Sequence, residues 1–112
     1  MKIAKIELEN GISVAISEDQ LPLTIGRAKD CDIRISEPTV SRLHCELFLD
    51  RAQELCLKDL SVNGTTVNDR IVLGESVRIG NSSNIWLADH CSLRVTRTDD
   101  DGITLIPMRS HG

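Results

Sequence analysis

The chain of 112 residues contains no tyrosine, and its only aromatic residues are Phe48 and Trp86. A core with so few rings has to be filled by valine, isoleucine and leucine, which pack well on the pleated surface of a β-sheet. About 40% of the residues are apolar, and a chain of this length buries roughly two-thirds of its unfolded surface. We therefore expect one folded domain rich in strands.

Basic residues and long apolar runs are also scarce. Thirteen Lys and Arg stand against seventeen Asp and Glu, a net charge of -4, which opposes nonspecific attraction to nucleic acid or anionic lipid. No apolar run approaches the roughly 20 residues of a membrane span. The first residues, MKIAKIELENG, carry charges where a signal peptide has an apolar segment. We expect a cytoplasmic protein that contacts neither nucleic acid nor membrane.

The four cysteines are Cys31, Cys45, Cys56 and Cys91, widely spaced and without a CxxC pair. Zinc sites need closer ligand spacing, and disulfides are rare in the cytosol. We predict that most of these cysteines are small buried hydrophobes, and that the protein uses no metal and no cofactor.

Short segments of alternating apolar and polar residues recur along the chain, and this period of two is typical of half-buried strands. They are residues 3–8, 12–16, 23–26, 32–35, 44–50, 54–59, 76–80, 84–88 and 92–96. Turn-forming pairs such as Asn10-Gly11 and Asn63-Gly64 separate them. The pattern predicts an all-β domain of about nine to eleven strands in two packed antiparallel sheets.

The strand pattern weakens after Thr96, so we place the domain at residues 1–97 and an acidic segment with a flexible tail at 98–112. A weak apolar run at 103–106 is either an edge strand or the start of a connector. Thr98 lies beside three aspartates. The segment is either a solvated linker or, once Thr98 is phosphorylated by an acid-directed kinase, a ligand for a second copy, which would give weak self-association.

Three motifs stand at predicted strand ends: Gly26-Arg27, residues 41–44 (Ser-Arg-Leu-His) and residues 63–68 (Asn-Gly-Thr-Thr-Val-Asn). This spacing indicates loops that share one rim of the β scaffold. Two arginines, a serine hydroxyl and an asparagine amide on such a rim suit a phosphorylated side chain and the backbone beside it.

The order Gly-Arg, Ser-Arg-x-His and Asp-x-Ser-x-Asn-Gly-Thr, followed by a further Asn, resembles the forkhead-associated (FHA) domain family, which recognises phosphothreonine peptides. The resemblance covers roughly residues 3–97. It implies an eleven-stranded β-sandwich of the FHA/SMAD-like type with its ligand loops at one end.

The resemblance also implies roles for single residues at this end. Arg27 matches the arginine that contacts the phosphate, and Ser41 matches the serine that donates to a phosphate oxygen. Arg42 stands where the family uses a basic or amide side chain against the same phosphate, and Asn63 matches the asparagine that holds the peptide main chain. Thr39 is placed to help read the residues after the phosphothreonine.

Other motif residues are expected to support the loops. The φ freedom of Gly26 lets the strand end turn, and by resemblance His44 is an internal brace between loops. Gly64 supports a turn, Thr65 makes a local backbone hydrogen bond, and Asn68 forms the next hairpin turn.

The chain departs from the family pattern at Val62, where a Thr or Ser hydroxyl usually precedes the Asn-Gly pair. We expect lower affinity unless Ser61 or a backbone N–H in the same turn supplies the missing hydrogen bond.

The leading hypothesis is a phosphothreonine-dependent adaptor that recruits a phosphorylated partner. The alternative is a scaffold of the same fold that docks independently of phosphate. An enzyme that pairs Cys45 with His44 is disfavoured, because adjacent residues of a strand point to opposite faces.

Overall fold

The described residues form two β-sheets of short strands and one turn of 3-10 helix. The computed structural model describes residues 2–89 and 91–98. The elements in chain order are β1 (Lys2–Leu8), β2 (Ser13–Ser17), η1 (Glu18–Gln20), β3 (Leu23–Gly26), β4 (Ile33–Arg34), β5 (Cys45–Leu49), β6 (Leu55–Asp59), β7 (Thr65–Val67), β8 (Arg70–Val72), β9 (Ser76–Arg78), β10 (Ser82–Ala88) and β11 (Cys91–Arg97).

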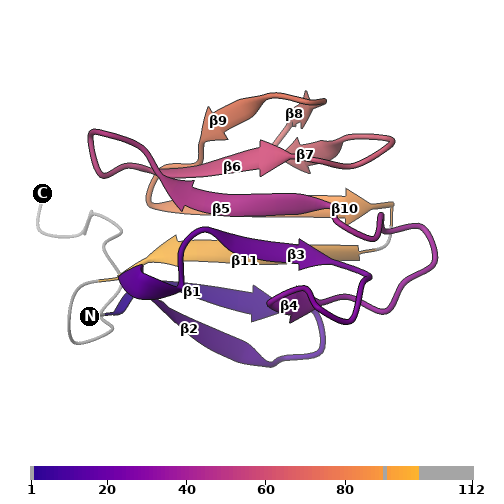
Figure 1. Ribbon diagram of the computed structural model, residues 1–112, viewed down its shortest axis with the longest axis horizontal. Coiled ribbons are helices and arrows are strands. Elements are labelled where there is room, and N and C mark those ends of the chain that lie inside the picture. Colours follow the sequence, from indigo (N-terminus) through magenta and orange to yellow (C-terminus); the bar gives the residue numbers. More distant parts are fainter. Residues whose placement is uncertain (1, 90, 99–112) are drawn as a thin grey trace, which may run out of the picture.

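The six-stranded sheet has the order β2-β1-β11-β10-β7-β8, and the five-stranded sheet has the order β4-β3-β5-β6-β9 (Figure 1). The predicted all-β sandwich of two sheets and about eleven strands is confirmed. One pair departs from antiparallel order, because β4 runs parallel to β3 with Gly26 opposite Arg34. This parallel pair places two loops at the same end of the molecule.

The predicted strand segments each contain an observed strand, but the alternating pattern did not reveal β7 and β8. Each has only three residues, which is too short for a period of two to stand out from the surrounding turn residues. The predicted loop over residues 63–68 is therefore partly a strand, and Asn63 and Gly64 lie immediately before it.

Aliphatic side chains fill the space between the sheets. Ile6, Ile25, Leu47, Leu57 and Ile85 are fully buried. On β10 every second residue is buried, as the alternation in the sequence predicts. Neither aromatic residue is among the buried core, so the branched aliphatics carry the packing as expected.

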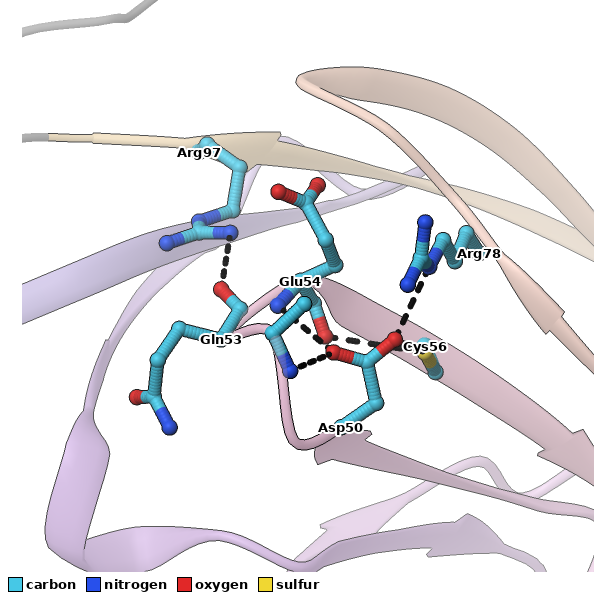
Figure 2. Close-up of polar contacts among 7 residues, drawn as sticks. Asp50, Gln53, Glu54, Cys56, Arg78 and Arg97 are labelled. Carbon is cyan, nitrogen blue, oxygen red and sulfur yellow. Dashed lines mark hydrogen bonds and ion pairs between the residues drawn. The ribbon is translucent and has the colours of Figure 1, made fainter.

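The hairpin between β5 and β6 is closed by side-chain contacts at the end opposite the loops that follow β3 and β6 (Figures 1 and 2). Asp50 accepts hydrogen bonds from the Glu54 amide at 3.0 Å and from Arg78 Nε at 2.8 Å. These two donors lower the pKa of Asp50. Arg97 on β11 donates to the Gln53 carbonyl at 3.4 Å, which ties the hairpin to the other sheet.

The C-terminal edge of the described structure differs from expectation. The Thr98 amide donates to the Ile3 carbonyl at 2.9 Å, and Thr98 is only 5% exposed. The prediction that Thr98 lies in an exposed segment is therefore wrong: a kinase would have to pull Thr98 away from β1, to which it is bonded just after the end of β11. The remainder of the predicted tail, with the run at 103–106, lies outside the described residues, so the proposed domain boundary stays a prediction.

Burial in the core gives a direct test of the packing. Leu57→Ala is expected to lower the free energy of unfolding by about 2 to 5 kcal/mol, since a fully buried leucine leaves a cavity. The measurement is equilibrium unfolding in urea. Leu73→Ala is the matched control: Leu73 is 60% exposed, so its loss should stay within about 0.5 kcal/mol. Equal losses in the two variants would contradict this assignment of the core.

Candidate functional site

The backbone of residues 42–44 crosses directly over the end of β3. A Cβ atom on Gly26 would lie 2.3 Å from the Arg42 carbonyl oxygen and 3.0 Å from the His44 nitrogen, far inside contact distance. Gly26 does not adopt a positive φ. The predicted reason for this glycine, its φ freedom, is therefore wrong. It is required because another stretch of backbone occupies the space of a side chain.

Backbone hydrogen bonds extend this contact into the loop after β3. The Arg27 amide donates to the Ser41 carbonyl at 3.0 Å, and the Ala28 amide donates to the Arg42 carbonyl at 3.0 Å. The loop after β3 and the loop before β5 are thus held side by side, and they carry four of the predicted ligand residues: Arg27, Thr39, Ser41 and Arg42.

Arg27 and Arg42 come together at one hollow of about 450 Å³. Arg27 is half-buried, and its Nε donates to the Val40 carbonyl at 3.0 Å, which leaves its terminal nitrogens for another partner. Arg42 is exposed. We call this hollow the cationic hollow; its lining residues are Arg27, Ala28, Lys29, Asp30, Arg34 and Arg42.

Ser41 lies between two loops next to these arginines. Its amide donates to His44 Nδ1 at 3.1 Å, and its Oγ accepts from the Val62 amide at 3.1 Å. Because the hydroxyl oxygen accepts this bond, its hydrogen remains to be donated elsewhere. Ser41 is half-buried and its hydroxyl is fixed by the Val62 amide, although Ser41 is not among the residues that line the cationic hollow.

Sequence reasoning gave no role to the aspartate of the Asp-x-Ser-x-Asn-Gly-Thr motif, yet Asp59 organises the whole loop. Its buried carboxylate accepts from Ser61 Oγ at 2.6 Å and from Thr65 Oγ1 at 2.7 Å. The Gly74 amide donates to the other oxygen at 2.9 Å. Burial alone would raise the pKa of Asp59, but the donated hydrogen bonds hold that pKa below its usual value. Thr65 therefore bonds a side chain rather than the backbone as expected.

The same network bears on the departure at Val62. The Ser61 hydroxyl donates its single hydrogen to Asp59 and accepts from the Gly64 amide at 2.7 Å. The Val62 amide already donates to Ser41 Oγ. The geometry argues against Ser61 or the Val62 amide as the compensating donor, because both hydrogens are engaged. A ligand role for Ser61 stays a prediction that would require this network to open.

Thr39 and Asn63 come together at a second hollow of about 750 Å³. We call it the flanking hollow, and it is lined by Glu37, Thr39, Asn63, Gly64, Thr66, Ile71, Trp86, Leu87, Ala88, Asp89 and Cys91. Gly64 adopts a φ of 99° at its edge, which suits the predicted turn.

Asn68 adopts a φ of 56° in the turn between β7 and β8, as predicted. Its amide donates to the Asn84 carbonyl at 2.7 Å, and its Oδ1 accepts from the Asn84 amide at 3.0 Å. Asn68 is thus tied to β10.

His44 is 1% exposed and joins the segments that carry the site. Its Nδ1 accepts from the Ser41 amide, and its carbonyl accepts from the Leu60 amide at 2.9 Å. Since Nδ1 is an acceptor, the neutral ring carries its hydrogen on Nε2. Nε2 has no hydrogen-bond partner among the described residues. Burial lowers the pKa of His44. The Gly64 backbone, which makes no hydrogen bond of normal geometry with Nε2, and the Asp59 carboxylate raise this pKa by smaller amounts.

The chemistry of the cysteines gives no support to catalysis. Cys45, Cys56 and Cys91 are buried, as predicted for most of the set, and Cys31 is partly exposed. Burial raises the pKa of the Cys45 thiol far above its usual value, which disfavours the thiolate that a nucleophile needs.

The described residues form neither a metal cluster nor a membrane-spanning helix. No group of three His, Cys, Asp or Glu side chains could hold a metal ion among residues 2–89 and 91–98. In the same part of the chain, no helix is long and apolar enough to cross a membrane.

The close approach at Gly26 predicts a specific loss. Gly26→Ala should lower the free energy of unfolding by about 2 kcal/mol or more, because backbone atoms cannot rotate out of the way of the new methyl group. Amide chemical shifts should change around residues 40–44. In the matched control Gly11→Ala, nothing lies within 4 Å of the added Cβ, so only φ strain of about 1 to 2 kcal/mol is expected. Unchanged shifts near residue 42 in Gly26→Ala would contradict the contact.

The buried His44 predicts a loss of stability in mild acid. Its pKa is lowered in the folded state, so below the ordinary value of about 6.5 the unfolded chain binds the extra proton more readily. The free energy of unfolding should therefore fall as the pH drops below about 6.5 and continue to fall toward the lowered pKa. A proton on Nδ1 would also face the Ser41 amide and push it away.

Urea unfolding at a series of pH values measures this effect. Between pH 6.5 and 5.5, the free energy of unfolding should change less steeply with pH in His44→Gln than in the wild type. The wild-type slope should persist when the other two histidines, His90 and His111, are replaced by glutamine. A slope that disappears only in the latter variant would assign the titration elsewhere.

Comparison with known proteins identifies the family. A family model described as the FHA domain matches residues 23–88. The FHA domain-containing protein PS1 of Arabidopsis thaliana is 34% identical over an alignment of 90 residues, which covers 69% of this chain and 6% of that protein. The chain thus spans a small fraction of this curated relative.

Solved structures agree. An FHA domain from a study of phosphothreonine-dependent FHA interactions is 31% identical, has a TM-score of 0.71, and the match covers 84% of this chain and 95% of that one. The N-terminal FHA domain of Saccharomyces cerevisiae RAD53P, in complex with a phosphothreonine peptide, shares the fold: 20% identity, a TM-score of 0.79, 89% and 97% covered. The chain belongs to the FHA domain family.

Proposed function

We propose that this FHA domain binds phosphothreonine-containing segments of partner proteins and recruits those partners without altering them. The observation that carries the proposal is the convergence of Arg27 and Arg42 on one hollow, with the Ser41 hydroxyl held beside them. A solved FHA domain of similar sequence comes from work on phosphothreonine-dependent interactions, which supports the same ligand for this chain.

The charges suit such a ligand. Phosphothreonine carries close to two negative charges at neutral pH and offers three acceptor oxygens. Hydrogen bonds to charged groups contribute about 1.5 to 3 kcal/mol each, so three or four of them with peptide contacts reach the roughly 8 kcal/mol of micromolar binding after ordering costs. Val62 supplies no side-chain donor, so the affinity should lie below that of a site with a hydroxyl there.

Asn63 and Thr39 extend the site beyond the phosphate. Both line the flanking hollow, whereas Arg42 of the same loop lines the cationic hollow. The Asn63 amide group has both donors and an acceptor for the main chain of an extended peptide. Thr39 and the apolar Ile71 and Trp86 would then contact side chains next to the phosphothreonine.

A second candidate function is supported by one feature of the sheet surface. Trp86 stands opposite Thr66, and Thr66 stands opposite Ile71, in a row across β10, β7 and β8. Trp86 is 40% exposed and Ile71 is 70% exposed. Such a row favours phosphate-independent docking of a partner on this face. Phosphatase treatment of the partner separates the two functions, since it would leave this second mode intact.

Removal of the phosphate contacts should weaken binding strongly. Arg27→Ala and Ser41→Ala are each expected to lower the affinity for a phosphothreonine peptide at least tenfold, because each variant loses a charge-assisted hydrogen bond worth about 1.4 kcal/mol or more. Isothermal titration against a peptide selected from a phosphothreonine library gives the dissociation constants.

Arg51→Ala is the matched control, because Arg51 is exposed in the hairpin at the opposite end of the sandwich. Its affinity should equal that of the wild type. The proposed function fails if the unphosphorylated peptide binds equally well. Unchanged affinity in both Arg27→Ala and Ser41→Ala would mean that the phosphate binds elsewhere.

A further inference from the structure

The cationic hollow holds more positive charge than one phosphate needs. Its lining contains four basic residues, Arg27, Lys29, Arg34 and Arg42, and one acidic residue, Asp30, so the lining carries a net charge of +3. A phosphothreonine dianion leaves at least one positive charge without a counterpart. This excess stands out in a chain whose net charge is -4.

These cations are not neutralised within the described structure. The ion pairs found among residues 2–89 and 91–98 join Lys5 to Glu7, Arg70 to Glu75 and Arg78 to Asp50. None of them includes a basic residue of the cationic hollow. Like charges confined to one hollow repel one another unless an anion lies between them, so this cluster favours a ligand with several negative charges.

Backbone carbonyls hold two of the guanidinium groups in position. Arg34 Nε donates to the Arg27 carbonyl at 3.1 Å, and Arg27 Nε donates to the Val40 carbonyl at 3.0 Å. Each arginine is anchored by one nitrogen, which leaves its two terminal nitrogens for bidentate contact with a phosphate or carboxylate. Arg34 ends β4 opposite Gly26, so its backbone is fixed by the sheet rather than by a loop.

We infer that the cationic hollow takes two anionic groups from one partner segment. The phosphothreonine lies against Arg27 and Arg42, and a second phosphate or a carboxylate on a neighbouring residue lies against Arg34 and Lys29. This inference rests on the proposed function, because the first anion anchors the segment. The preferred partners are therefore doubly phosphorylated segments, or segments with an acidic residue close to the phosphothreonine.

Titration with matched peptides tests this specificity. Each peptide keeps the same sequence and phosphothreonine, and carries in turn a phosphoserine, a glutamate or an unmodified serine at each flanking position. At the best position the second phosphate should strengthen binding at least about fivefold, and glutamate should give a smaller gain because it carries less charge. The gain in affinity should shrink as the salt concentration is raised, since Lys29 and Arg34 are exposed.

Variants locate the second anion. The readout is the ratio of the affinities for the doubly and singly phosphorylated peptides. Arg34→Gln and the double variant Lys29→Gln/Arg34→Gln should bring this ratio below about two, whereas the control Arg51→Gln should keep the wild-type ratio. Arg34→Lys should give an intermediate ratio, because a lysine keeps the charge without the bidentate geometry.

Three outcomes would overturn the inference or its basis. If singly phosphorylated peptides bind but no second phosphate adds more than about twofold, the inference is wrong and the proposed function stands. If the ratio stays at the wild-type value in the double variant, the second anion does not lie against Arg34 and Lys29, and the inference is wrong. If no phosphorylated peptide binds better than its unphosphorylated form, the proposed function itself fails.

Discussion

The contact between Gly26 and the backbone of residues 42–44 is the constraint on which the site depends. With no side chain at Gly26, a second stretch of chain passes over the end of β3 closely enough for the Arg27 amide to bond the Ser41 carbonyl. This backbone contact sets Arg27 and Arg42 at one hollow. Any side chain at this position would separate the two loops, so the requirement is steric and lies outside the ligand contacts themselves.

A second constraint is that a buried carboxylate near the site must not pair with its arginines. Asp59 is buried a few residues from the predicted ligands, yet it forms no ion pair with an arginine of the cationic hollow, because amides and hydroxyls from Ser61, Thr65 and Gly74 occupy its oxygens. These neutral donors stabilise the carboxylate. The loop thus gains a rigid centre without consuming the cations, which remain for an anionic ligand.

Sequence reasoning reached what depends on local pattern and on motif. Alternation in 84–88 predicted the buried and exposed faces of β10, and the scarcity of aromatic residues predicted an aliphatic core. It failed where distant segments meet. Arg34 looks like an ordinary exposed charge until β4 pairs with β3, and the role of Gly26 depends on residues sixteen or more positions away. The three aspartates after Thr98 indicate an exposed segment, whereas the backbone contact of Thr98 with Ile3 joins residues at opposite ends of the sequence and leaves no local pattern.

Under the proposed function, the two hollows divide recognition between them. The segment of residues 39–42 contributes to both: Thr39 lines the flanking hollow, while the Val40 carbonyl anchors Arg27 in the cationic hollow. Contacts in the cationic hollow are charged, and Lys29, Arg34 and Arg42 are exposed, so these contacts distinguish a phosphate from a hydroxyl but weaken as salt rises. Contacts with Ile71 and Trp86 are apolar and barely sensitive to salt. Every phosphothreonine makes the same charged contacts, so these contacts cannot tell one phosphorylated partner from another. That discrimination has to come from the residues beside the phosphothreonine. Charged neighbours would be read in the cationic hollow and apolar neighbours in the flanking hollow.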